Sequence, residues 1–89
     1  MTEYDVEGFE VWMRNNRKYN ESLVALRARV IRDARERRIP WETLRSMDSS
    51  DLYYALYDRP HGSKSHRASI RSAVTSYEQY LDMKARGGA

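Results

Sequence analysis

Four potential cations stand close together at a point where the sequence should begin a helix. They are Lys64, His66, Arg67 and Arg71, in the stretch SKSHRASIR, and an amphipathic pattern follows them as far as Asp82. The start of a helix already carries partial positive charge from its free N–H groups, so further cations are unfavourable there unless an anion offsets them. The cluster therefore predicts either a tolerated, solvated group of charges or a site for an anion such as phosphate.

Charge is also distributed unevenly along the chain. Residues 1–13 hold four acids and no cation, whereas residues 14–38 hold nine cations and three acids. Residues 39–60 are again net acidic and residues 61–89 are net basic, within a formal net charge of +3. Two basic segments that share one face of the fold would suit a nucleic acid, because phosphate neutralisation supplies much of the affinity for DNA.

The sequence contains no set of side chains typical of catalysis or metal binding. The chain has no cysteine, which excludes thiol chemistry and disulfides. His61 and His66 have no metal-ligand spacing, and Asp48 and Asp51 are better explained as helix-capping residues than as a catalytic carboxylate pair. We therefore predict no catalytic residue, no metal site and no cofactor.

Length and composition limit the chain to one small domain. With 89 residues, of which 40% are hydrophobic and 33% charged, the sequence is typical of a globular domain with one modest core. We expect a single domain over residues 1–89, with its core at 5–84. No apolar run approaches about 18 residues and the first residues hold no signal-peptide core, so we expect a cytoplasmic protein with no membrane partner.

The elements that must position the cations are helices, because no stretch alternates apolar and polar residues for long enough to be a strand. Four helices fit the apolar spacing: residues 5–15, Asn20 to just before Pro40, Asp48 or Ser49 to Tyr57, and Ser63 or Ser65 to Gly87-Gly88. Residues 40–44 are predicted to form a short turn of helix or a hydrophobic loop. The aromatic residues are assigned to the core rather than to a base-stacking surface. The expected core comprises Phe9, Trp12, Leu26, Val30, Leu52, Leu56, Val74, Tyr77 and Leu81.

Several arginines fall outside this core or at its edge. A stripe of three lies on the back of the second helix and is interpreted as a solvated face or a binding surface: Arg29, Arg32 and Arg35. Arg27 falls inside the apolar arc of that helix, where we expect it to snorkel or to find a partner. Arg67 and Arg71 lie one turn apart, off the apolar face of the last helix, so we expect that the fold does not need them.

Residues 5–84 resemble the N-terminal core-binding domain of tyrosine recombinases, the SAM-like domain of phage integrases. The matching stretches are FEVWM (9–13), NESLVALRARV (20–30), MDSSDLYYAL (47–56) and SKSHRASIRSAVTSYEQYLD (63–82). These are patterns of apolar spacing and helix caps, without an invariant catalytic signature. The resemblance implies an all-α, SAM-like, orthogonal four-helix bundle that grips duplex DNA with the starts of its second and fourth helices.

Matched by position, the resemblance implies that ten residues at these two helix starts contact DNA. They are Arg17, Lys18, Tyr19, Asn20, Ser22, Lys64, Ser65, His66, Arg67 and Arg71. Any reading of base edges would come from one or more of four of these residues: Asn20, His66, Arg67 and Arg71. The implied partners are double-stranded DNA and, on that DNA, a recombinase or further copies of this chain.

The catalytic half of the recombinase family has no counterpart in these residues. Its constellation would need about another domain's length beyond Ala89, and none of the seven tyrosines stands in the family's nucleophile context. We therefore expect a non-catalytic DNA-binding module, either an excised domain or a small protein that kept only this half. The alternative is a small helical protein-interaction domain that binds its partner through the acidic first helix and Tyr53, Tyr54 and Tyr57.

Overall fold

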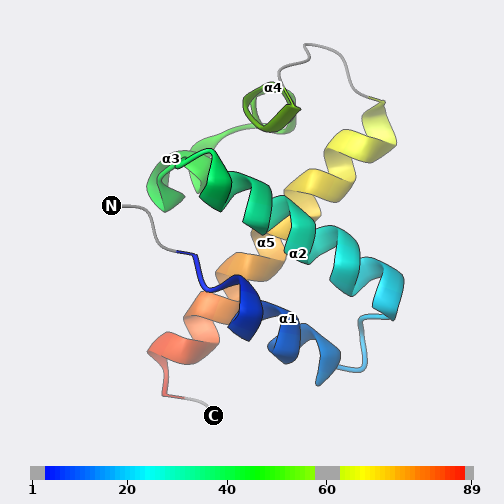
Figure 1. The fold of residues 1–89 in the computed structure, drawn as a ribbon, viewed down its shortest axis with the longest axis vertical. Helices are drawn as coiled ribbons and strands as arrows, with labels where there is room; N and C mark the ends of the chain where they lie inside the picture. The colour runs from blue at the N-terminus through cyan, green and yellow to red at the C-terminus, as the bar shows by residue number, and fades with distance from the viewer. Residues whose placement is uncertain (1–3, 58–62, 88–89) are drawn as a thin grey trace.

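The computed structural model describes residues 4–57 and 63–87, and all regular structure in these ranges is helical (Figure 1). The helices are α1 (Val6–Arg14), α2 (Glu21–Glu36), α3 (Trp41–Ser46), α4 (Ser49–Tyr57) and α5 (Lys64–Ala85). The all-α prediction is confirmed, but the count of four is wrong for the described residues. Residues 41–46 form a helix of their own, because Pro40 is extended and restarts the chain as an N-cap, and because Leu44 is fully buried.

Short polar side chains fix where the helices begin, largely as the sequence predicts. Asn20 Oδ1 accepts a hydrogen bond from Leu23 N at 2.9 Å, which confirms the cap of α2. At α4 the cap is Asp48, whose Oδ1 accepts from Asp51 N at 2.8 Å. At α5 it is Ser63, whose Oγ accepts from the N–H three residues on, at 3.1 Å. These caps satisfy N–H groups that the first turn of a helix leaves without partners.

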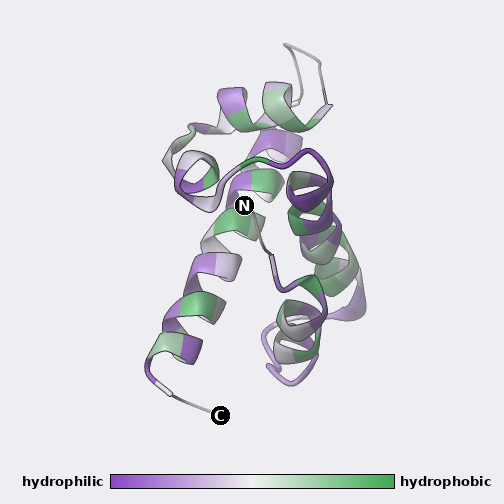
Figure 2. Cartoon of the chain, turned by 60° about the vertical axis from the view of Figure 1, so that its left-hand side comes forward, coloured by the Kyte–Doolittle hydropathy of each residue, from purple (hydrophilic) through white to green (hydrophobic). Residues whose placement is uncertain are grey.

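The long helix α5 is the centre of the fold and packs against all four other helices. Its partner α2 crosses it near its middle in Figure 1. Hydrophilic and hydrophobic segments alternate along the helices in Figure 2, as expected of amphipathic helices around one core. Six of the nine expected core side chains are buried: Phe9, Val30, Leu52, Leu56, Val74 and Tyr77. The other three, Trp12, Leu26 and Leu81, are half-buried, and Trp12 and Leu81 pack against the core.

A cluster of hydrogen bonds, the Asp5 clasp, ties the start of α1 to the C-terminal half of α5. Tyr80 Oη donates to Asp5 Oδ2 at 2.6 Å, and Lys84 Nζ lies 3.2 Å from the same oxygen. Asp5 N in turn donates to Tyr77 Oη at 2.9 Å. The hydrogen bond from the Tyr80 hydroxyl, together with that from Gly8 N, lowers the pKa of the Asp5 carboxyl below its ordinary value. The clasp therefore joins the start of the first helix to the last helix.

The ends of the described ranges bear on several predictions. The predicted end of the last helix is confirmed at Gly87, which has a φ of 69°, a left-handed conformation that glycine adopts without strain. Gly88 lies outside the described residues, and so do residues 58–62, which include His61 and follow the third predicted helix. Within the described ranges, no helix is long and apolar enough to cross a membrane.

Candidate nucleic-acid interface

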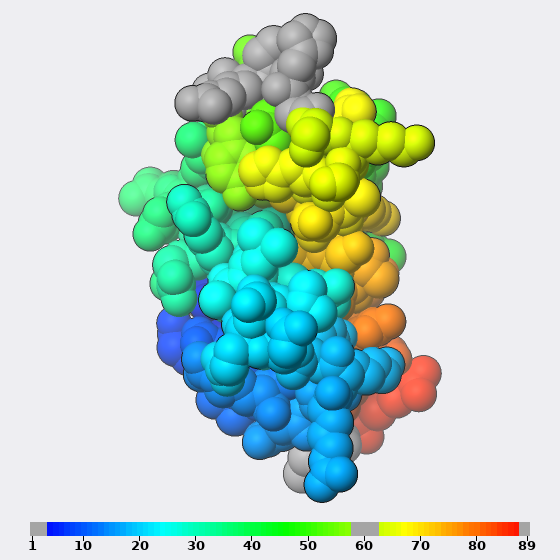
Figure 3. Space-filling view, turned by 90° about the vertical axis from the view of Figure 1, so that its right-hand side faces the viewer, coloured from blue at the N-terminus to red at the C-terminus, as the bar shows by residue number. Residues whose placement is uncertain are grey.

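The ten predicted contact residues lie in two segments that the fold brings to one face. The first segment is the turn between α1 and α2 with the first turn of α2, and the second is the first two turns of α5. Figure 3 shows the start of α2, in cyan, beside the first half of α5, in yellow to orange. Three of the ten, Lys18, Tyr19 and Arg71, line the same groove. The two segments therefore meet at this groove, and contact of the ten residues with DNA stays a prediction.

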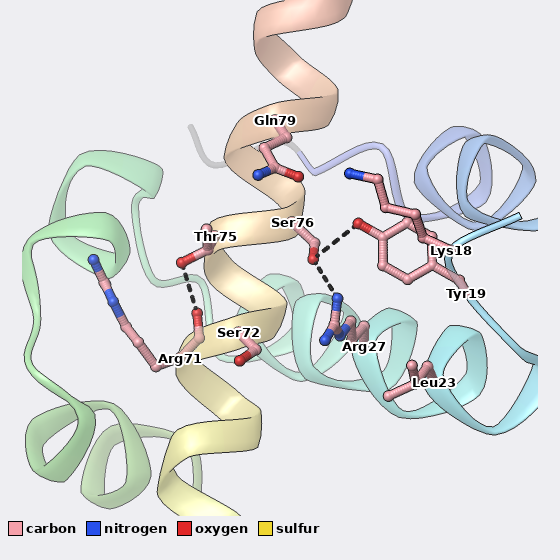
Figure 4. A pocket seen from close by; sticks show the side chains of 9 residues that line it. All are labelled: Lys18, Tyr19, Leu23, Arg27, Arg71, Ser72, Thr75, Ser76 and Gln79. Atoms are coloured by element: carbon pink, nitrogen blue, oxygen red, sulfur yellow. Dashed lines mark hydrogen bonds between the residues drawn. The ribbon is translucent and has the colours of Figure 1, made fainter. Parts of the chain in front are cut away.

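This groove, the α2–α5 groove, has a volume of about 420 Å³ and lies where the two helices cross. Figure 4 shows its lining residues from close by. From the α2 side come Lys18, Tyr19, Leu23 and Arg27, and from α5 come Arg71, Ser72, Thr75, Ser76 and Gln79. No acid stands among these described lining residues, so the groove combines cations with hydroxyl and amide groups.

Arg27 forms the floor of the groove, although the sequence pattern does not place it among the contact residues. Its Nη1 donates to Ser76 Oγ at 2.7 Å, and its guanidinium carbon lies 5.1 Å from the centre of the Tyr19 ring. The Tyr19 hydroxyl also donates to Ser76 Oγ, at 3.4 Å. The expectation that Arg27 finds a partner inside the apolar arc is confirmed, but that partner is a neutral hydroxyl. A cation inside an apolar stripe was the sequence signal that could have marked this position.

The expectation that the fold does not need Arg67 and Arg71 is wrong. Arg71 Nη1 donates to the carbonyl oxygens of Arg45 and Met47, each at 3.2 Å, and so holds the end of α3 onto α5. Figure 4 shows its side chain directed away from the groove, towards α3 and α4. Arg67 Nη1 donates to Ser50 Oγ in α4 at 2.9 Å. Its Nε is buried and has no hydrogen-bond partner in the described part of the chain.

The remaining predicted residues of the first turn of α5 differ in their surroundings. The His66 ring packs edge-on against Tyr53, with 5.3 Å between ring centres, and lies 5.8 Å from Tyr57. Lys64 and Ser65 are exposed, and Lys64 has no ion pair with any described residue. Arg17, at the other segment, is likewise exposed and without an ion pair among the described residues.

Two arginines of the stripe on the back of α2 have acidic partners on α1. Arg32 Nη2 lies 4.0 Å from a Glu10 carboxylate oxygen, and Arg35 Nη1 lies 3.5 Å from Glu7. Glu10 also pairs with Arg14 at 2.8 Å. The acidic first segment of the sequence thus neutralises part of the basic second segment within the fold.

Tyrosine hydroxyls and possible metal ligands were the remaining groups with potential for chemistry. Burial raises the pKa of Tyr4 to about 12 and also raises the pKa of Tyr77 and Tyr80 above the ordinary value. Because burial disfavours the charged phenolate, these hydroxyls stay protonated at neutral pH. Within residues 4–57 and 63–87, no group of three histidine, aspartate or glutamate side chains could hold a metal ion.

Comparison with known proteins adds no relative to this picture. No family model, no curated protein and no solved structure matches the chain. The resemblance to recombinase core-binding domains therefore rests on sequence stretches such as MDSSDLYYAL at 47–56, and the function has to be argued from the geometry of this face.

Proposed function

We propose that this chain is a non-catalytic module that binds duplex DNA with the face where α5 crosses the start of α2. One observation carries the proposal: the cations of this face have no carboxylate partner among the described residues. Lys18 and Arg27 line a groove that has no acid among its described lining residues, and Arg17 and Lys64, from the same two segments, are exposed and have no ion pair with a described residue. On the side of α2 that faces α1, by contrast, Arg32 and Arg35 each have a glutamate carboxylate oxygen within 4.0 Å.

Cations without partners suit the phosphate backbone, because neutralising phosphate releases condensed counterions and supplies much of the affinity. Base contacts need side chains that reach a groove edge with free donors or acceptors. Of the four residues offered by the sequence, Asn20 and His66 are exposed, and Asn20 caps α2 with its Oδ1 while its amide N–H donors stay available. Arg67 and Arg71, in contrast, use guanidinium donors on partners inside the molecule. We assign base reading to Asn20 and His66 and the structural support of this face to the two arginines.

The proposal extends to the finer fold and to partners. We propose that the helices adopt the SAM-like, orthogonal arrangement of recombinase core-binding domains, with the short α3 as an addition between the second and third expected helices. In this proposal α2 and α5 are the helices that approach DNA. A recombinase, or further copies of this chain on the same DNA, would be the protein partners.

The alternative, a protein-interaction domain, has less support from the described surface. Of the three tyrosines assigned to it, Tyr53 is buried and Tyr57 is half-buried, which leaves Tyr54 exposed. The acidic side chains Glu7 and Glu10 of the first helix are paired with arginines of this chain. Neither surface therefore offers a large unpaired group to a partner.

The test is a titration of the protein with a short labelled duplex, followed by fluorescence anisotropy at several salt concentrations. The logarithm of affinity should fall linearly with the logarithm of salt concentration, with a slope of about 0.9 per phosphate contact. Substituting the exposed or unpaired cations (Arg17→Gln, Lys18→Gln, Lys64→Gln) should weaken binding and flatten this slope.

A matched control removes the same charge from paired positions, with Arg32→Gln, Arg35→Gln and Arg45→Gln. The control should keep most of the affinity and slope of the wild type. Equal loss in the two triple variants would show that net charge, and not this face, drives binding. A wild type that fails to bind duplex DNA even at low salt would favour the protein-interaction alternative.

A further inference from the structure

We propose that the α2–α5 groove is a binding site for a single phosphate group, held by Arg27 from its floor and Lys18 from its rim. That the phosphate belongs to the DNA backbone rests on the proposed function. The site itself rests on the groove and can be tested without DNA.

The first argument is the unbalanced charge of Arg27. Its side chain is half-buried, and the described residues place no carboxylate within ion-pair distance of it. Ser76 Oγ, a neutral acceptor, is the partner that its guanidinium has. Removing a charge from water is costly unless an opposite charge compensates it. An anion in the groove would supply that compensation.

Three exposed arginines differ from Arg27 in having a carboxylate partner. Arg14, Arg32 and Arg45 each have a carboxylate oxygen within 4.0 Å, although all three are exposed to solvent. Arg27 is more enclosed than these three and lacks such a partner among the described residues. Arg67 and Arg71 are also half-buried without a carboxylate partner among the described residues, but Arg67 donates to Ser50 and Arg71 to two carbonyl oxygens at the end of α3. Of the arginines that line the groove, Arg27 is therefore the one whose guanidinium lies in it.

The second argument is the chemistry of the lining, which suits a tetrahedral oxyanion. The Arg27 guanidinium offers a planar fork of N–H donors, which matches two oxygens of a phosphate. In Figure 4 the Gln79 side chain points towards Lys18, so an amide and an ammonium group face each other across the groove. At about 420 Å³ the groove is larger than one phosphate needs, which leaves room for the sugars on either side.

The third argument is that the guanidinium is oriented before any ligand arrives. Ser76 holds one nitrogen, and the Tyr19 ring lies against the guanidinium group. Ser76 is itself only 3% exposed, so its hydroxyl is fixed by the packing of α5 against α2. A donor that is already ordered loses little entropy on binding. Such a contact fixes the register of a protein on the duplex without reading sequence.

The experiment combines salt-dependent duplex binding with substitution of single phosphates by neutral methylphosphonates. Arg27→Gln should weaken binding about tenfold and reduce the salt slope by about 0.9, the value for one phosphate contact. Arg27→Lys should keep the slope and lose part of the affinity, because it keeps the charge and loses the fork. At one backbone position a methylphosphonate should weaken the wild type and leave Arg27→Gln unaffected.

Lys18→Gln guards against a folding defect, because the Lys18 side chain is exposed and makes no hydrogen bond or ion pair with the described residues. Lys18→Gln should reduce the salt slope of duplex binding as Arg27→Gln does. Arg35→Gln is the control and should leave the slope unchanged, because Arg35 is also in α2 but is paired with Glu7. Inorganic phosphate alone should raise the melting temperature of the wild type more than that of Arg27→Gln, at matched ionic strength.

The outcomes separate this inference from the proposed function. If duplex binding is normal and neither Arg27→Gln nor Lys18→Gln changes its slope, the phosphate site is wrong and DNA binding stands. If duplex DNA does not bind but phosphate stabilises the wild type through Arg27, DNA binding is wrong and the groove is a site for free phosphate. If duplex DNA does not bind and phosphate does not stabilise the wild type through Arg27, both proposals are overturned.

Discussion

Arginines on two sides of α2 have different surroundings. Towards α1, Arg32 and Arg35 lie opposite Glu10 and Glu7, so their charge is balanced within the molecule. Towards α5, Arg27 meets a hydroxyl and an aromatic ring in an acid-free groove. The difference teaches that the number of arginines on a helix does not identify a binding face. What separates the two sides is whether the facing residues include a carboxylate, which α1 supplies to Arg32 and Arg35 and which the described lining of the groove does not supply to Arg27.

The two regions should therefore respond differently to substitution. On the α1 side, charged groups belong to the packing of the first helix, together with the Asp5 clasp. Exposed ion pairs there contribute little to stability individually, about 0–1 kcal/mol. Changes on the α1 side should alter the free energy of unfolding, and changes in the groove should alter affinity for DNA.

The largest effect is expected from Gly8→Ala in α1. A Cβ at this position would overlap the Tyr80 hydroxyl and the Asp5 carboxylate, and so would break the clasp. We expect the free energy of unfolding to fall by about 2–3 kcal/mol, from overpacking and from an unsatisfied buried hydroxyl. Urea unfolding measures this, and duplex affinity measured well below the midpoint should stay unchanged. A stable Gly8→Ala variant with lost DNA binding would break the comparison.

The next effect concerns Arg71, which is among the lining residues of the groove but whose guanidinium makes hydrogen bonds within the fold. Arg71→Ala removes hydrogen bonds to two carbonyls at the end of α3 and should lower the free energy of unfolding by about 1–2 kcal/mol. Because its guanidinium points away from the groove, the salt slope of duplex binding should change less than with Lys18→Gln. If the free energy of unfolding were unchanged and the salt slope were flatter, Arg71 would contact DNA rather than support the fold.

A carboxylate placed in the groove should pair with its cations, as the glutamates of α1 pair with Arg32 and Arg35. Gln79→Glu is nearly isosteric, lies at an exposed position, and would face Lys18. We expect about a tenfold loss of duplex affinity, about 1.4 kcal/mol, because the new acid competes with phosphate and repels it. Thermal unfolding should show little change. Gln79→Ala, which removes the amide without adding charge, is the control and should bind nearly as well as the wild type.

The converse substitution should free the paired arginines. Glu7→Gln with Glu10→Gln removes the partners of Arg35 and Arg32 and adds two positive charges to the net charge. We expect duplex affinity at low salt to rise only about two- to threefold, and stability to fall by under about 1 kcal/mol. A rise as large as the loss caused by Gln79→Glu would mean that both sides of α2 bind DNA equally well.

The smallest effect is a pH dependence of the α1 side. The pKa of Asp5 is lowered in the fold, chiefly by the Tyr80 hydrogen bond, from its ordinary value of 3.8. A lowered pKa contributes stability above the ordinary value, and that stability is lost as pH falls through the folded pKa. The difference in unfolding free energy between wild type and Asp5→Asn should therefore shrink below about pH 4. If the difference were constant from about pH 6 to about pH 2, the carboxylate charge would not contribute through the clasp.

The helix boundaries could be predicted because they depend on neighbours in sequence. Asn20, Asp48 and Ser63 cap the helices whose starts they mark, and Pro40 separates α2 from α3. The sequence does not decide between a helical turn and a loop at α3, because six residues are too few to show a periodicity that distinguishes the two.

The candidate site could be predicted only as far as its two segments, because the rest depends on tertiary contacts. Nothing in the local sequence shows that the end of α3 lies within reach of Arg71, or that Glu7 lies opposite Arg35. The role of Arg27 likewise emerges only when Ser76, 49 residues later, is placed beside it. Helical spacing tells which residues share a face, and the crossing of two helices decides which of them meet.

The Asp5 clasp has a consequence for the order in which the chain can close during its synthesis. Asp5 leaves the ribosome early, but the hydroxyl from which it accepts lies 75 residues further along. Until Tyr77, Tyr80 and Lys84 have been made, the buried face of α1 lacks the helix against which its end is tied. Phe9 lacks its contacts with the Tyr77 and Tyr80 rings until then, and partly uncovered apolar groups make a chain prone to aggregate. Residues 1–13 hold four acids and no cation, and this net charge favours the solubility of the segment while its contacts with α5 are missing.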